Sequence, residues 1–283
     1  MQEDPGVTST SERQRAAARA RLEKEMAERT ARARRRRQTQ AIVGAGAALL
    51  LVVAGTVWLV SSLGDDSATD STITAGAGDC AFTEVPADQR TPQIKDVGLP
   101  SNQQPNTGTQ TLTIDTNLGQ ITAKVDRSQT PCTSASFTHL AEQNFFDNTK
   151  CHRLVTEGIK VLQCGDPSAT GDGWRETDGT GGPSYRLAEE NLPTDKRPPY
   201  PEGVIAMANS GAPGSTGSQF FIVYGDSPLD PNYTVLGTVT GGLDIVKEVA
   251  AAGDDAAYAQ MAGGGHPKKE VTITDLTMSA PQG

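Results

Sequence analysis

The strongest feature of the hydropathy pattern is a single unbroken apolar run near the N-terminus. Residues 1–40 show no apolar periodicity, whereas residues 41–60 (AIVGAGAALLLVVAGTVWLV) contain no charged side chain. As a helix this run would be about 30 Å long, which matches the hydrocarbon core of a bilayer. Trp58 lies near its end, where an amphipathic ring suits the interface. The run exceeds the apolar region of a cleaved signal peptide, so the pattern predicts a single transmembrane helix.

Charge gives the predicted span an orientation. Residues 1–40 hold eleven Lys/Arg and six Asp/Glu, although the whole chain has a formal net charge of −9. Arg32 and residues 34–37 precede the span, and residues 61–89 contain no Lys or Arg. The positive-inside rule therefore predicts a cytoplasmic N-terminus and an extracytoplasmic C-terminal part. The basic arm is either solvated or in contact with anionic lipids. No nucleic-acid partner is expected, because no aromatic residues or nucleic-acid-binding fold accompany the arginines.

The remaining pattern divides into a linker and a domain. Residues 61–110 are rich in Gly, Ser, Thr, Asp and Pro, which predicts an extended polar linker. Alternation in TLTIDT (111–116) and QITAKV (120–125) predicts a hairpin that opens a domain over residues 111–283. Short strands with two helices indicate a mainly β fold. Helices are expected at 130–142 and 243–251, and further strands at 152–155, 159–163, 204–207, 219–223, 233–239 and 271–278.

One stretch of the domain, residues 203–223 (GVIAMANSGAPGSTGSQFFIV), stands out. Two apolar strands enclose a segment that is rich in Gly, Pro and Ser. This composition predicts a loop, because Gly supplies positive φ and Pro fixes φ. On periodicity alone it is a β-hairpin with a long loop. Neither phosphate-loop pattern occurs, because no Lys-Ser/Thr follows the glycines and GxGxxG is absent.

The order MAN, Gly-Pro and GSQFF in this stretch resembles the core motif of the cyclophilin-type peptidyl-prolyl isomerases. A second stretch, FFDNTKCHRLVTEGIKVLQCGD (145–166), resembles the same family and lies upstream in the family's order. The resemblance covers residues 111–278. It implies a closed antiparallel β-barrel capped by two helices, isomerisation of X–Pro bonds, and no cofactor or metal. Together with the predicted topology, this makes exported or surface proteins the expected substrates.

The resemblance also assigns site residues. Arg153 of the His-Arg pair would stabilise the twisted amide, because a fixed guanidinium can donate to the pyramidal proline nitrogen. Gln163 would hold Arg153 or contact the substrate carbonyl. The pocket for the proline ring and the backbone on either side would be formed by Val161, Ala208, Asn209, Gln219, Phe221, Leu229 and Tyr233.

Departures from the family pattern keep an alternative open. Lys160 and Val161 stand where the family usually has Phe and Met, and the spacing from Arg153 to the glutamine is two residues longer. Pro228 stands where many members have a tryptophan that touches cyclosporin, and Tyr233 replaces a histidine. We expect weaker cyclosporin binding than in typical members. The alternative function is a module that binds proline-containing peptides, in a chaperone role, without catalysis.

All four cysteines follow the predicted span, as expected for disulfides in an extracytoplasmic domain. Three connectivities are open, and free buried thiols are the alternative. The short separation of Cys151 and Cys164 favours that pair, which leaves Cys80 with Cys132. The absence of CxxC, HExxH and GxSxG motifs argues against zinc, metalloprotease and serine-hydrolase sites.

Overall fold

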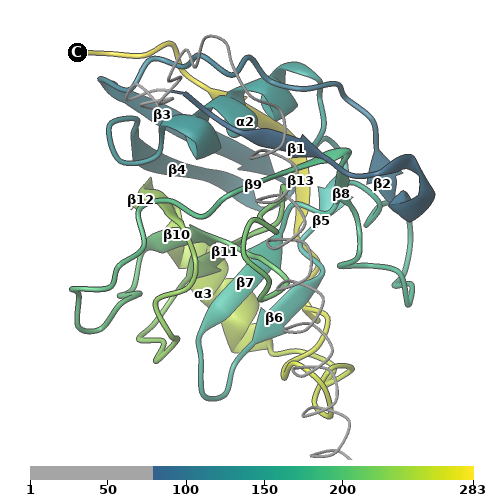
Figure 1. Cartoon of the computed structure of the whole chain (residues 1–283). Coiled ribbons are helices and arrows are strands. Elements are labelled where there is room, and N and C mark those ends of the chain that lie inside the picture. The colour runs from purple at the N-terminus through teal and green to yellow at the C-terminus, as the bar shows by residue number, and fades with distance from the viewer. Residues whose placement is uncertain (1–78) are drawn as a thin grey trace, which may run out of the picture. The chain divides into compact units, whose positions relative to one another are not determined.

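A computed structural model of the chain describes residues 79–283 (Figure 1). The predicted arm and transmembrane span (1–60) and the first part of the predicted linker lie outside the described residues. Within residues 79–283, no helix has the length and apolar character needed to cross a bilayer. The division of the chain into arm, span, linker and domain therefore stays a prediction.

Residues 111–283 contain the elements that the hydropathy pattern predicts, with small shifts at their ends. The hairpin, the two helices and the six further strands are all present within a few residues of the expected positions. The elements are β3 (Thr109–Thr116), β4 (Gly119–Asp126), α2 (Pro131–Glu142), β5 (Thr149–Lys150), β6 (Arg153–Val155), β7 (Val161–Cys164), β8 (Gly182–Pro183), β9 (Tyr185–Leu187), β10 (Val204–Met207), β11 (Phe220–Val223), β12 (Val235–Gly241), α3 (Leu243–Ala252) and β13 (Thr272–Met278).

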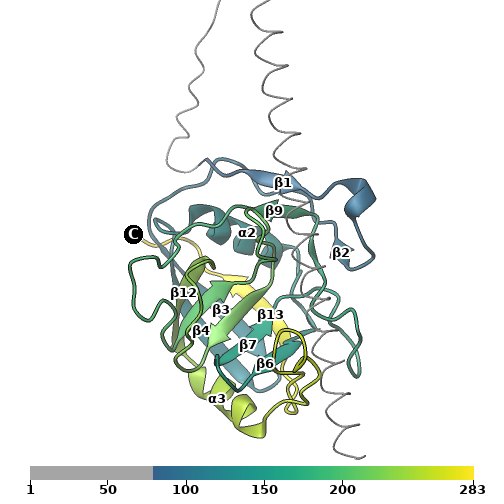
Figure 2. The same cartoon turned by 60° about the horizontal axis from the view of Figure 1, so that its bottom comes forward.

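The main sheet has nine strands in the order β5-β13-β3-β4-β12-β10-β11-β7-β6, all paired antiparallel. It curls into a half-barrel, with α2 toward one end and α3 toward the other (Figures 1 and 2). The closed barrel implied by the resemblance is wrong, because the edge strands β5 and β6 do not pair with each other. Loop residues cover both edges instead: Thr170 bridges to Thr149, and Gly265 bridges to Leu154.

Apolar residues are buried on both faces of the sheet near β10 and β11. Because side chains alternate along a strand, Phe220 and Ile222 join the main core, whereas Phe221 and Val223 join a smaller outer cluster. Tyr200 belongs to the same outer cluster. The continuous apolar run FFIV in β11 is therefore explained by burial on two faces, and the outer cluster is the one that carries the candidate site.

Residues 79–110, within the predicted linker, pack against the domain. They form β1 (Phe82–Glu84), a 3₁₀ helix (Ala87–Gln89) and β2 (Ile94–Lys95). Strand β1 pairs with β9, and β2 pairs with β8. Phe82 is buried, because it packs edge-on against the fully buried Tyr185 at 5.5 Å between ring centroids.

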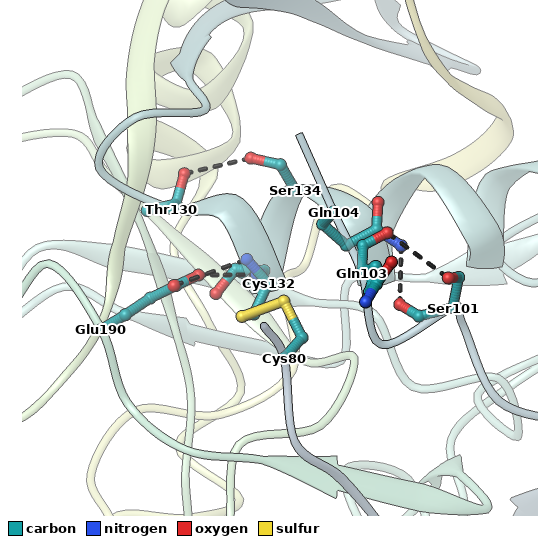
Figure 3. The surroundings of a disulfide bond; sticks show 9 residues. Cys80, Ser101, Gln103, Gln104, Thr130, Cys132, Ser134 and Glu190 are labelled. Carbon is teal, nitrogen blue, oxygen red and sulfur yellow. Dashed lines mark hydrogen bonds between the residues drawn. A yellow bond between two sulfur atoms is a disulfide. The ribbon is translucent and has the colours of Figure 1, made fainter. Parts of the chain in front are cut away.

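Two disulfides stabilise the described structure, and they join the pairs that the sequence favours. Cys80–Cys132 connects the N-terminal segment to the first turn of α2 (Figure 3). Beside it, the Glu190 carboxylate accepts the Thr133 amide at 2.6 Å, which places a negative charge at the helix N-terminus. Cys151–Cys164 links the segment just before β6 to the last residue of β7.

Candidate functional site

A single cross-strand row carries the centre of the candidate site. Arg153 on β6 lies opposite Gln163 on β7, which lies opposite Phe221 on β11. Directly paired residues in a sheet point to the same face, so the three side chains are neighbours because of strand register alone. Ala206 on β10 continues the row next to Phe221.

Arg153, Gln163 and Phe221 line a cavity of about 200 Å³ on the outer face of the sheet. It contains eight of the nine catalytic and substrate-binding residues that the resemblance assigns, and it adds Ile159. The ninth, Gln219, lines a neighbouring cavity of about 370 Å³, which shares Gln163, Ala208 and Asn209 with the first. The smaller cavity is lined by Arg153, Ile159, Val161, Gln163, Ala208, Asn209, Phe221, Leu229 and Tyr233.

Two aromatic rings, Phe221 and Tyr233, line the smaller cavity, and the buried ring of Tyr200 packs against both of them. Phe221 and Tyr233 are perpendicular, with centroids 5.4 Å apart, and Tyr200 stands 6.2 Å from Phe221. The Tyr200 hydroxyl donates to the Tyr233 carbonyl at 2.9 Å and accepts the Tyr233 amide at 2.8 Å. Burial raises the pKa of Tyr200 to about 12, so the hydroxyl stays protonated and keeps both bonds. Sequence reasoning missed Tyr200, because it lies outside both motifs.

Arg153 is held by three separate acceptors. Its Nη1 donates to Gln163 Oε1 at 3.1 Å, its Nε donates to the Gly263 carbonyl at 3.1 Å, and its Nη2 donates to the Ala262 carbonyl. Burial lowers the pKa of Arg153 from its ordinary value, and the nearby Tyr233 and Tyr258 oppose this shift. An arginine starts from such a high pKa that it stays charged.

Gln163 connects Arg153 to the second cavity. Its Nε2 donates to Gln219 Oε1 at 3.0 Å, and Gln219 in turn donates to the carbonyls of Gly179 and Gly181, both at 2.9 Å. The orientation of Gln163 is fixed by this chain, since its oxygen must face the arginine and its nitrogen must face Gln219.

The backbone beside Phe221 leads into the Gly-rich loop. Ala208 N donates to the Gln219 carbonyl at 2.8 Å, and the Asn209 side chain donates to the Asn232 carbonyl at 2.9 Å. Ala208 and Asn209 therefore have a fixed backbone at the border of both cavities.

The unusual Lys160 does not line either cavity. Its Nζ donates to the Thr156 carbonyl across the β6–β7 turn, whereas Val161 is buried and lines the smaller cavity. Ile159 lines the same cavity from this turn. Ile159 from the longer turn and Val161 from the start of β7 therefore supply aliphatic side chains to the cavity, and Lys160 does not take part.

His152, the neighbour of Arg153, is 2% exposed and lines neither cavity. Within residues 79–283, neither of its ring nitrogens has a hydrogen-bond partner. Burial lowers the pKa of His152 to about 4, against smaller opposing effects of Asp166 and Asp178. A buried, neutral histidine away from the cavities is a structural residue. The described residues also contain no group of three His, Cys, Asp or Glu side chains arranged to hold a metal ion.

The arrangement suits chemistry that needs a fixed positive charge and no nucleophile. A guanidinium lies at the rim of an aromatic-floored cavity, and fixed backbone groups lie beside it. The carbonyls of Ala262 and Gly263 were missed by sequence reasoning. Their only sequence signal is the run Gly263-Gly264-Gly265, since consecutive glycines indicate a close backbone approach.

Residues 111–278 match the model of the family described as cyclophilin type peptidyl-prolyl cis-trans isomerase/CLD. Two similar proteins are the probable peptidyl-prolyl cis-trans isomerases B of Mycobacterium leprae, 46% identical over 175 residues, and of Mycobacterium tuberculosis, 41% identical over 202 residues. The alignments cover 58% and 65% of this chain and 55% and 60% of those relatives, so the chain spans little more than half of their length.

A similar solved structure is that of a cyclophilin type isomerase of Cryptosporidium parvum, with a TM-score of 0.50 and 26% identity. The superposition covers 62% of this chain and 99% of that one. The matched residues 111–278 include both strands that carry Arg153 and Gln163 and the strand that carries Phe221. Since the family model covers more than half of the chain, the protein belongs to the cyclophilin-type peptidyl-prolyl cis-trans isomerase family.

Proposed function

We propose that the chain catalyses cis-trans isomerisation of X–Pro bonds in polypeptides. One observation carries the proposal: the Arg153 guanidinium is fixed at the rim of a cavity of about 200 Å³ whose floor is Phe221. The same arrangement of a cation beside an apolar slot is what the reaction requires. Similar proteins carry this activity in their names, and a second Cryptosporidium structure of the same isomerase was determined in the presence of the dipeptide Ala-Pro.

The reaction is slow because amide resonance imposes a barrier of roughly 18–20 kcal/mol. As the bond twists, the proline nitrogen becomes pyramidal and gains a lone pair. In the proposed mechanism an N–H of Arg153 donates to that lone pair, while the proline ring rests on Phe221 between Leu229 and Tyr233. The arginine is already oriented by its protein acceptors, so little reorganisation is needed at the transition state. No covalent intermediate forms.

The segment on either side of the proline would lie along the backbone at Ala208 and Asn209. These residues border both cavities, so a peptide whose proline occupies the smaller cavity would pass a neighbouring residue over the larger one. Holding the chain on either side is necessary, because rotation about the amide requires one end of the substrate to stay fixed.

Exchange spectroscopy by NMR on a short X–Pro peptide tests the proposal. The full chain, in detergent, should accelerate exchange, and Arg153→Ala should lose about 100-fold or more of that acceleration. Arg90→Ala is the matched control, because Arg90 also makes polar contacts but lines neither cavity. A wild-type chain that leaves the exchange rate unchanged would refute the proposal, and so would equal losses in the two variants.

One observation favours the non-catalytic peptide-binding module as a second candidate. Three donors of Arg153 already have protein acceptors, which leaves fewer N–H groups for a substrate. A module of this kind would bind the same peptide with similar affinity in wild type and Arg153→Ala, and neither would change the exchange rate. Titration of the peptide, followed by NMR shifts, separates the two candidates.

We also propose that the catalytic domain lies outside the cytoplasm and is anchored by residues 41–60, with folding of exported or surface proteins as its task. The charge-free apolar run, the preceding arginines and the location of all cysteines after the run support this proposal. Protease added to intact cells should remove the domain and spare residues 1–40. Alanine at positions 34–37 should weaken this orientation and any binding to anionic vesicles. Full protection of the domain would count against the proposed topology.

A further inference from the structure

The loop between α3 and β13, residues 254–266, returns to the candidate active site from a distant part of the chain. In both views it lies beside β6 (Figures 1 and 2). The carbonyls of Ala262 and Gly263 accept from Nη2 and Nε of Arg153, as described above. The loop therefore binds two of the three nitrogens of the guanidinium group.

The inner end of the loop is fastened to the strand that carries Arg153. Gly265 and Leu154 exchange both backbone hydrogen bonds, at 2.8 and 3.0 Å. Gly264 has φ +71°, and a Cβ at that position would collide with the carbonyl oxygen of Leu154. Only glycine lets the loop approach β6 this closely.

His266, the residue after Gly265, makes a second set of contacts that holds the loop. Its Nδ1 lies 2.8 Å from Asp255 Oδ2, and its Nε2 lies 2.7 Å from the Tyr258 hydroxyl. Trp174 stacks on the imidazole ring at 4.5 Å with an interplanar angle of 9°. The Asp255 carboxylate also accepts the amides of His266 and Ala257, so one side chain closes the loop on itself.

We propose that the 254–266 loop is a positioning element for Arg153, which fixes the direction in which the guanidinium presents its free N–H groups to the substrate. The inference rests on the isomerase function proposed above and names the residues that act through Arg153: the carbonyls of Ala262 and Gly263, held by Gly264 and by the Asp255–His266 pair.

The hydrogen-bond pattern explains what the loop contributes. The Nε of an arginine carries one N–H, whereas Nη1 and Nη2 carry two each. The loop occupies Nε and one N–H of Nη2, and Gln163 occupies one N–H of Nη1. The guanidinium plane is thus fixed from two sides, by the sheet and by the loop. What remains free is one N–H on each terminal nitrogen, available to a proline nitrogen and its neighbouring groups.

Gly264→Ala tests the inference directly, because its Cβ must push the loop away from Leu154. Gly98→Ala is the matched control: Gly98 has φ +70°, but an added Cβ would meet nothing within 4 Å. Peptide isomerisation by the full chain should lose about tenfold in kcat in Gly264→Ala, with KM nearly unchanged since the proline cavity keeps its walls. Gly98→Ala should retain the wild-type kcat.

A double-mutant cycle with Arg153→Lys shows whether the loop acts through the arginine. A lysine ammonium cannot donate to both loop carbonyls in the fixed planar geometry of a guanidinium. Gly264→Ala should therefore change kcat by less than about twofold in the Arg153→Lys background. Equal losses in both backgrounds would overturn the inference, as would a wild-type kcat in Gly264→Ala.

If Gly264→Ala fails to fold, Asp255→Ala serves in its place, since it frees the loop from His266 without a collision. The Arg153 Nε–H resonance is a readout independent of activity: it should shift and exchange faster with water in either variant. An unchanged resonance would overturn the inference even in an active enzyme. A wild-type chain without isomerase activity would overturn the proposed function and the inference together, whereas an active wild type with unaffected variants removes the inference alone.

Discussion

The two sides of Arg153 are built in different ways. On one side, the sheet flank, Gln163 and Phe221 follow Arg153 in a cross-strand row whose order is set by strand register. On the other side, the loop flank, Ala262 and Gly263 reach the guanidinium through backbone carbonyls on a loop about 110 residues later in the chain. Phe221 of the sheet flank also belongs to the buried outer cluster, whereas Ala262 is exposed and Gly263 is half-buried.

The difference teaches which property each side controls. Changes in the sheet flank alter both the stability and the proline cavity, because the same side chains are packed and line the cavity. Changes in the loop flank alter only how the guanidinium is held. Substitutions that separate these two effects therefore test the comparison.

Phe221→Ala should have the largest effect. Removing a large buried side chain costs about 3–5 kcal/mol of unfolding free energy, and here the floor of the proline cavity is lost as well. Urea unfolding and peptide KM measure the two consequences. Val223→Ala is the control, since Val223 belongs to the same outer cluster but lines neither cavity. If the Phe221 variant kept the wild-type KM, this ring would not form the substrate pocket.

Removal of the Cys151–Cys164 disulfide by serine at both positions should rank next. This disulfide joins residues with a sequence separation of 13, for which the chain-entropy model gives about 3 kcal/mol of unfolding free energy. Cys151 lies just before β6 and Cys164 ends β7, so kcat should fall in the folded variant as well. The Cys80–Cys132 pair closes 52 residues and is expected to contribute about 4 kcal/mol of stability, but its loss should leave kcat unchanged. An equal loss of kcat in both double variants would mean that the site responds to stability in general.

Acid should weaken the fold through His152, the buried chain neighbour of Arg153. Its pKa is lowered to about 4 by burial, from an ordinary value of 6.5. Above pH 6.5, His152 is neutral in both the folded and the unfolded state. Between these two pKa values only the unfolded state binds the proton, so stability falls as the pH falls.

The effect is measured by urea unfolding of wild type and His152→Gln at pH 7.5 and pH 5. The variant should lose less stability than wild type between the two pH values. The same decrease in both proteins would show that other groups are responsible.

The sequence predicted the sheet flank well because its information is local. Period-two alternation locates β3 and β4, and a continuous apolar run locates β11; the motif residues on β6, β7 and β11 come together once those strands pair. The strands that were not predicted are short: β1, β2, β5, β8 and β9 have two or three residues each, which is too few for a periodic signal. Barrel closure was expected from resemblance alone, and in the structure the edge strands β5 and β6 pair with loop residues and not with each other.

The loop flank could not be predicted, because nothing local indicates its partners. Three glycines show that a backbone approaches closely, but they do not show that the neighbour is Leu154. His266 also stacks on Trp174, which lies more than 90 positions earlier in the chain. Backbone carbonyls as ligands of Arg153 also leave no trace in side-chain identity, so only the folded structure reveals them.

Gln163→Leu should have the smallest effect, and it compares the two flanks most directly. Leucine keeps the volume but removes the acceptor of Arg153 Nη1 and the donor to Gln219, while both loop carbonyls still hold the guanidinium. Loss of one hydrogen bond to a charged group should therefore lower kcat only about tenfold. Gln219→Leu, which spares the Arg153 bond, should lose less. If Gln163→Leu abolished activity as fully as Arg153→Ala, the sheet flank alone would orient the arginine, and the loop would contribute nothing to catalysis.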